Sequence, residues 1–182
     1  MLSHLTRALA LASLMLLAVA SSAAMAAAPP MTGGVAAVTI PSPAPGAVAT
    51  VDKFGMAHAP AGAPRAVRAA IAAGNKIAGR PYVWGGGHAK WNSRGYDCSG
   101  SVSYVLHAAH LLDSPLVSGA FARSWGVRGK GRWITVYANG GHAFVFLAGL
   151  RFDTSGRGGS GPRWRLEPRQ MQGFAARHPR GL

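Results

Sequence analysis

Hydrophobic residues recur at helical spacing in two segments of the chain. In the first segment, residues 65–78, they are Val67, Ala70, Ile71 and Ile77. In the second, residues 98–109, they are Val102, Val105, Leu106 and Ala109. Good helix formers fill the positions between, and Gly79 followed by Pro81 ends the first segment. The spacing predicts two amphipathic helices, each with one face toward a core.

The second half of the chain has short runs of aromatic and aliphatic residues, which are typical of strands. These runs are residues 133–137, 143–147 and 150–152, with residues 164–166 as a further edge strand. Only Ala148 and Gly149 separate the second run from the third, which predicts a tight hairpin. Helices followed by an antiparallel sheet indicate an α+β fold.

The first 28 residues have the pattern of a secretory signal peptide. His4 and Arg7 precede the apolar run Leu9–Ala20, and small residues follow it. The run is short for a membrane span, so we expect cleavage near Ala26 or Ala28 and export; a retained membrane anchor is the alternative. No second run approaches spanning length, so no transmembrane segment is expected in the mature chain.

The remaining chain divides by composition. Residues 29–64 are rich in Pro, Ala and Gly and predict a linker that we expect to be disordered. Residues 65–182 are expected to form one domain that ends in a basic tail. Residues 113–131 are rich in glycine and basic residues, without a strong period.

The chain of 182 residues has 19 Lys and Arg against 5 Asp and Glu, a formal net charge of +14. Such an excess favours a polyanionic partner, but it does not separate nucleic acid from an anionic wall or membrane. The single cysteine excludes an intramolecular disulfide, and no Cys/His cluster has zinc-finger spacing. We therefore expect neither a bound metal nor a cofactor.

The position of that cysteine predicts a reactive thiol. Cys98 follows Asp97, a good N-cap residue, and opens the second predicted helix. The free amides and positive dipole end of a helix N-terminus stabilise a thiolate, which is the nucleophilic form of cysteine. Gly100 keeps the approach to the sulfur open. The alternative is a small buried hydrophobic residue.

His142 and Asp153 are the candidate partners of Cys98. His142 opens one strand of the predicted hairpin and Asp153 ends the other. A two-residue loop places both on one face, as direct or diagonal neighbours, so that the carboxylate can fix the imidazole tautomer. The alternative is a surface histidine and an aspartate that only begins a turn. If Asp153 points to solvent, Ser155 or a backbone carbonyl is the next candidate for the orienting group.

Two motifs resemble the NlpC-type family of cell-wall cysteine peptidases. Residues 79–86 read G-R-P-Y-V-W-G-G, and residues 96–104 read Y-D-C-S-G-S-V-S-Y. The family has a G-x-P-Y-x-W-G-G segment and a D-C-S-G-x-V nucleophile helix. The resemblance, over residues 65–155, implies a papain-like α+β domain with the nucleophile at a helix N-terminus. It also implies hydrolysis of peptide bonds in peptidoglycan stems.

The resemblance also implies site roles. Cys98 would be the nucleophile, His142 the general base and Asp153 the third member, where the family usually has His, Asn or Gln. The substrate-binding candidates are Tyr82, Trp84, Asp97 and Ser99. An aspartate in the third position would raise the basicity of His142 more than a neutral amide would. Residues 131–137 lack the family's Gly-Asp pair, which leaves substrate contacts from that loop open.

The leading hypothesis is an exported, wall-associated cysteine hydrolase that acts on peptidoglycan peptides. An amidase or acyltransferase could use the same Cys–His site, and a non-catalytic wall-binding module is a further alternative. The basic tail, residues 163–180, could stack bases on Trp164 and Phe174, but no nucleic-acid motif accompanies it. We expect the excess charge to hold anionic wall polymers instead.

Overall fold

The computed structural model describes residues 48–156 and 160–182. The expected signal peptide and the first part of the expected linker lie outside these residues. Within the described ranges, no helix is both long enough and apolar enough to cross a membrane.

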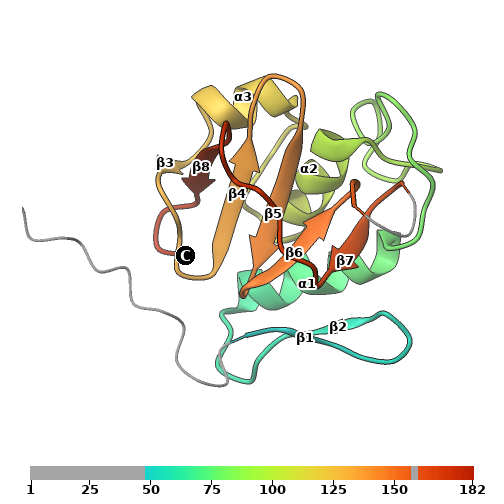
Figure 1. Cartoon of the computed structure of the whole chain (residues 1–182), viewed down its shortest axis with the longest axis vertical. Coiled ribbons are helices and arrows are strands. Elements are labelled where there is room, and N and C mark those ends of the chain that lie inside the picture. The colour runs from blue at the N-terminus through green and yellow to red at the C-terminus, as the bar shows by residue number, and fades with distance from the viewer. Residues whose placement is uncertain (1–47, 157–159) are drawn as a thin grey trace, which may run out of the picture. The chain divides into compact units, whose positions relative to one another are not determined.

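A six-stranded antiparallel sheet forms the centre of the domain (Figure 1). In spatial order its strands are β3 (Val127–Arg128), β8 (Ala175–His178), β4 (Ile134–Ala138), β5 (Ala143–Leu147), β6 (Leu150–Asp153) and β7 (Arg163–Arg165). Alternate residues of β4 to β6, such as Val136, Val145 and Phe152, belong to the main hydrophobic core. Phe144, on the other face of β5, is fully buried but lies outside that core cluster. Both faces of the sheet are therefore covered.

Three helices accompany the sheet in the described residues: α1 (Arg65–Ile77), α2 (Cys98–Ala108) and α3 (Ser118–Arg123). The first two pack against each other and against β5, whereas α3 packs against β4 and β8. The observed starts of α1 and α2 agree with the predicted segments. Helices packed on an antiparallel sheet confirm the α+β fold class.

The end of the expected linker differs from the prediction. Residues 48–64 contain a small antiparallel hairpin, β1 (Thr50–Val51) with β2 (Ala57–His58). Its residues Ala49 and Ala57 are buried, and the backbone of Ala57 forms two hydrogen bonds with the Asn75 side chain of α1. A strand of two residues is too short to produce a hydrophobic period. The pattern of an Ala-rich sequence therefore does not predict it.

The basic tail also contains regular structure. Strand β8 lies between β3 and β4, so the last part of the chain is an interior strand of the sheet, next to the edge strand β3. Arg177 of this strand is 6% exposed, and its Nε donates to the carbonyl of Ala122. A strand that buries arginine against backbone carbonyls has no hydrophobic alternation, which explains why the pattern did not predict it.

Candidate active site

The N-terminus of α2 holds Cys98 in a fixed position. Asp97 caps the helix, since its Oδ1 accepts a hydrogen bond of 2.7 Å from the Gly100 amide. A Cβ at Gly100 would lie 2.0 Å from the carbonyl oxygen of Gly86, so this position requires glycine. The D-C-S-G motif therefore packs the start of α2 directly onto the glycine turn of the first motif.

Asp97 also organises that turn. Its Oδ2 accepts a hydrogen bond of 3.0 Å from the Gly85 amide, and its Oδ1 lies 3.1 Å from His88 Nε2. Ser99 Oγ lies 3.2 Å from both Asp97 Oδ1 and His88 Nε2. Asp97 is 7% exposed and Ser99 is 5% exposed. Both predicted substrate-binding residues thus have their polar atoms engaged inside the protein, where they shape the loop.

His142 and Asp153 meet across the β5–β6 hairpin. Leu147 pairs with Leu150 around a two-residue turn, so the register places His142 diagonally opposite Asp153 on the same face. His142 Nε2 lies 2.9 Å from Asp153 Oδ1. Ala148 and Gly149 both have positive φ, of 47° and 76°, as a tight two-residue hairpin requires.

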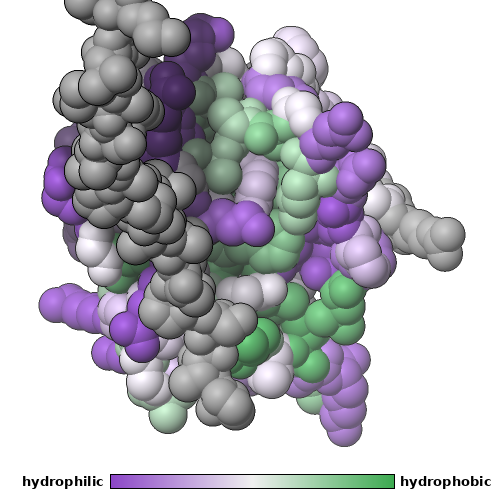
Figure 2. Space-filling model, turned by 60° about the vertical axis from the view of Figure 1, so that its left-hand side comes forward, coloured by the Kyte–Doolittle hydropathy of each residue, from purple (hydrophilic) through white to green (hydrophobic). Residues whose placement is uncertain are grey.

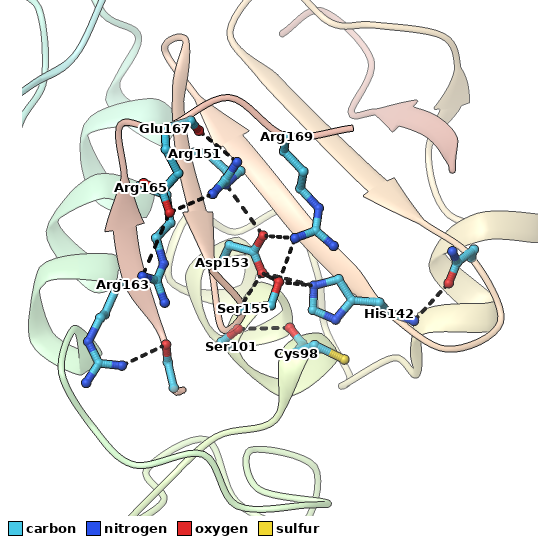
Figure 3. A network of polar contacts seen from close by, with 12 residues as sticks. Cys98, Ser101, His142, Arg151, Asp153, Ser155, Arg163, Arg165, Glu167 and Arg169 are labelled. Carbon is cyan, nitrogen blue, oxygen red and sulfur yellow. Dashed lines mark hydrogen bonds and ion pairs between the residues drawn. The ribbon is translucent and has the colours of Figure 1, made fainter. Parts of the chain in front are cut away.

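The imidazole of His142 also reaches the thiol of Cys98 (Figure 3). Asp153 engages Nε2, so Nδ1 is the nitrogen that remains for the sulfur. Burial raises the pKa of the Cys98 thiol, but hydrogen bonds from His142 and the Ala143 amide outweigh it, and the net pKa is lowered. Burial likewise opposes the charge on His142, yet hydrogen bonds to Asp153 and Cys98 raise its pKa to about 9. These shifts favour a thiolate–imidazolium pair at neutral pH.

Asp153 is 1% exposed and has several further donors. The Ser155 amide donates to its Oδ1 at 2.9 Å, and Arg169 Nη1 donates to its Oδ2 at 3.0 Å. Arg151 Nε lies 3.5 Å from the same Oδ2. Burial raises the pKa of Asp153, but the hydrogen bonds from His142 and Ser155 outweigh it, so the carboxyl has a lowered pKa and remains ionised.

The sequence prediction did not include Arg151 or Arg169. Arg151 precedes Asp153 by two residues on the same strand, and this period places both side chains on one face. That signal could have identified Arg151. Arg169 belongs to an irregular segment of the basic tail, where no pattern distinguished it from its neighbours.

A cleft of about 380 Å³ opens beside the catalytic candidates. Its lining residues are Tyr82, His142, Thr154, Ser155, Gly156 and Ser160. Burial raises the pKa of Tyr82, and the nearby Cys98 and Asp97 raise it further. Its hydroxyl therefore stays protonated and can donate a hydrogen bond. Trp84 is 85% exposed and is not among the lining residues. The described residues contain no group of three or more His, Cys, Asp or Glu side chains that could hold a metal ion.

Comparison with known proteins agrees with this fold. No model of a known protein family matches the chain, and no curated protein matches it either. Among solved structures, the peptidoglycan hydrolase RipB from Mycobacterium tuberculosis is similar, with a TM-score of 0.50 and 25% identity over 64% of this chain and 68% of that chain. The P60 domain of an antigen from M. avium subspecies paratuberculosis has a TM-score of 0.46 and 23% identity, over 62% of this chain and 94% of that chain. The chain resembles the NlpC-type family of cell-wall hydrolases, as the motifs around Tyr82 and Cys98 predict.

Proposed function

We propose that the protein is a cysteine hydrolase that cleaves amide bonds in peptidoglycan stem peptides. The observation that carries this proposal is the arrangement of His142, whose Nε2 lies 2.9 Å from Asp153 while its ring lies beside the Cys98 thiol (Figure 3). The similarity to RipB, which is described as a peptidoglycan hydrolase, supports the substrate class.

In the acylation step, the Cys98 thiolate attacks the carbonyl carbon of the scissile amide. A C–S bond forms, and the carbonyl π electrons move to the oxygen. As the oxyanion collapses, the C–N bond breaks and the imidazolium of His142 gives its proton to the departing nitrogen, which leaves as an amine. The backbone amide of Cys98, at the first position of α2, is the proposed oxyanion donor.

In the deacylation step, neutral His142 takes a proton from water, and the oxygen attacks the thioester carbon. The C–S bond breaks, the peptide leaves as a carboxylic acid that gives its proton to the solvent, and the thiolate–imidazolium pair forms again. Asp153 remains ionised and keeps the imidazole oriented throughout. Tyr82, which lines the cleft, is proposed to hold the substrate, and Trp84 to extend this surface outside the cleft. Asp97 and Ser99 would support these contacts through the loop.

The site of action is proposed to be the cell wall, outside the cytoplasmic membrane. Residues 1–28 would direct export and be removed near Ala26 or Ala28. The secreted or periplasmic enzyme would then meet peptidoglycan directly. Mass determination of the protein recovered outside the cytoplasm tests this part, and an intact N-terminus there would contradict it.

Replacement of the nucleophile tests the activity. We expect Cys98→Ala to lower the rate of stem-peptide cleavage in purified muropeptides by about a thousandfold or more, because no other group can form the thioester. Ser124→Ala, at an exposed serine that follows α3, is the control and should retain full activity. Undiminished cleavage by Cys98→Ala would disprove the mechanism.

The products distinguish the alternatives. New amino groups within the stem peptide indicate an endopeptidase, release of the whole peptide from the sugar indicates an amidase, and transfer to an added amine indicates an acyltransferase. Binding of muropeptides without cleavage, together with an unreactive Cys98 thiol at neutral pH, would leave the wall-binding module as the function.

A further inference from the structure

The chain between β7 and β8 crosses the face of the sheet that carries Phe144. Figure 1 shows this segment, in red, running from β7 across the sheet to β8. We call residues 166–174 the strap. Arg169 Cζ lies 4.5 Å from the centroid of the Phe144 ring and 5.3 Å from that of Phe174. The Phe174 ring is in turn T-shaped with respect to the His142 ring, with 6.3 Å between the ring centroids. The strap therefore packs beside His142 and Phe144, next to the cleft but not among its lining residues.

Arg169 makes two polar contacts from the strap (Figure 3). Its Nη1 donates to Asp153 Oδ2 at 3.0 Å and to Ser155 Oγ at 2.6 Å. Ser155 Oγ lies 3.0 Å from Asp153 Oδ1 and 3.3 Å from His142 Nε2. One guanidinium thus holds both oxygen-bearing side chains on the side of the imidazole that faces away from Cys98.

We propose that Arg169 is a positioning residue of the catalytic site, which fixes Asp153 and Ser155 behind His142 and makes the strap part of the catalytic unit. The effect on turnover rests on the proposed function, whereas the effect on the Cys98–His142 pair does not. The alternative role is structural, in which Arg169 only packs the strap on Phe144 and Phe174.

The charge of Arg169 distinguishes the positioning role from the purely structural role. Besides Arg169, the ionisable groups that act directly on His142 and Asp153 are Cys98 from α2 and Arg151 from β6. The next groups out are Glu167, which lies beside Arg151 and Arg165, Asp97, which acts on Cys98, and His88, which contacts Asp97. Tyr82 lines the same cleft as His142. Arg169 donates a direct hydrogen bond to Asp153 Oδ2. Removal of a cation stabilises the protonated form of each nearby group, so the pKa values of both Cys98 and His142 should rise.

The test uses alkylation by iodoacetate. Cys98 is the only cysteine of the chain, so the reaction reports on it alone. The rate rises with pH as the thiolate forms, and it falls again when His142 loses the proton whose charge attracts the carboxylate of the reagent. In Arg169→Gln we expect both midpoints to move up by about half a unit to one unit. Arg169→Lys keeps the charge and should retain the wild-type midpoints.

A matched control uses Arg132, which is exposed and lies beside Trp133. Arg132→Gln makes the same change of charge and should move neither midpoint. Unchanged midpoints in Arg169→Gln, or equal shifts in both glutamine variants, would overturn the proposal. If Arg169→Gln does not fold, Arg169→Met replaces it, since the Met side chain keeps the packing on Phe144 and Phe174. Loss of folding in both variants would show a structural role and also overturn it.

Turnover gives a second readout. With muropeptides, Arg169→Gln should lower kcat by about tenfold to a hundredfold and leave KM nearly unchanged, because it disturbs the orientation of His142 and not substrate contacts. If the midpoints shift but the wild-type protein does not cleave muropeptides, the proposed function fails and the role of Arg169 stands. If the alkylation rate of the wild-type protein does not both rise and fall with pH, the proposed function and the proposed role of Arg169 are both overturned.

Discussion

His142 has partners on both sides of its ring, and its pKa of about 9 depends on both of them. Asp153 supplies a hydrogen bond and a negative charge, and Cys98 supplies the same when it is ionised. If the pKa of His142 were too high, the imidazole would stay protonated and could not accept a proton from water in the deacylation step. A general base works best when its pKa is near the working pH. The arginines beside Asp153 offset part of its charge and so limit this effect.

The Asp153→Asn substitution tests the contribution of the carboxylate. The amide oxygen can still accept from His142 Nε2, but the negative charge is gone. We therefore expect the pKa of His142 to fall from about 9 toward its ordinary value of 6.5. The upper midpoint of iodoacetate alkylation should move down, in the direction opposite to that expected for Arg169→Gln.

Asp113→Asn provides the control, because Asp113 is exposed and the chemical change is identical. Its profile should match that of the wild type. If the upper midpoint of Asp153→Asn also stays in place, Asp153 does not set the basicity of His142.

Local sequence was sufficient to predict that Cys98, His142 and Asp153 lie close together. Cys98 could be placed by its N-cap and helix, and His142 and Asp153 by the parity of a two-residue hairpin. The loop contacts of Asp97, and the positions of Ser155 and Arg169, depend on segments without a period. Their contacts follow from tertiary packing, which a local pattern does not encode.

At the level of elements, Trp164 of β7 connects the sheet to α1 and to the N-terminal hairpin. Its Nε1 donates to Asn75 Oδ1 at 2.8 Å, and the same Asn75 side chain binds the backbone of Ala57 in β2. A Cβ at Gly74 would lie 2.6 Å from the Trp164 ring. Glycine in the last turn of α1 is therefore required for this close packing.

The Gly74→Ala substitution should destabilise the protein although alanine favours helices. Helix propensity alone would stabilise α1 by about 1 kcal/mol, but the overlap with Trp164 costs about 1–3 kcal/mol in forced displacement. We expect a net decrease in the free energy of unfolding, measured by denaturant titration. Ala72→Gly is the control, because Ala72 is exposed on the same helix. It gives the difference in helix propensity between alanine and glycine without a change in side-chain packing. A more stable Gly74→Ala protein would show that Trp164 can move away without loss.

Hydrophobic periodicity identified the elements that are long or have one apolar face, namely α1, α2 and β4 to β6. It did not identify α3, the two-residue strands or β8. In β8, hydrogen bonds from buried Arg177 replace hydrophobic contacts on one face, so the strand has the composition of a solvent-exposed tail.

For the whole molecule, the excess of basic residues is the dominant surface property. The formal net charge is +14, and Figure 2 shows hydrophilic residues around a hydrophobic patch on one face of the molecule. Arg128, Lys130 and Arg132 follow one another closely and are all exposed. Their charged side chains are exposed to solvent. We propose that such residues attract anionic wall polymers by long-range electrostatics and so retain the protein on the wall.

Sedimentation with isolated cell walls tests this retention, and the Cys98→Ala protein is used so that the walls are not digested. At about 0.05 M salt the protein should sediment with the walls. At about 1 M salt it should be released, since the screening length falls to roughly 3 Å. Walls from which the phosphate-containing polymers have been extracted should bind less of it at low salt.

A variant with Arg128, Lys130 and Arg132 all replaced by Gln should be released at lower salt than the parent protein, because three of the charges that attract the polymer are gone. Equal binding to native and extracted walls would instead indicate recognition of peptidoglycan itself. Binding that persists at about 1 M salt would have the same meaning, since only short-range contacts survive that screening. In either case the cleft beside Tyr82, and not the net charge, would be the feature that holds the enzyme on the wall.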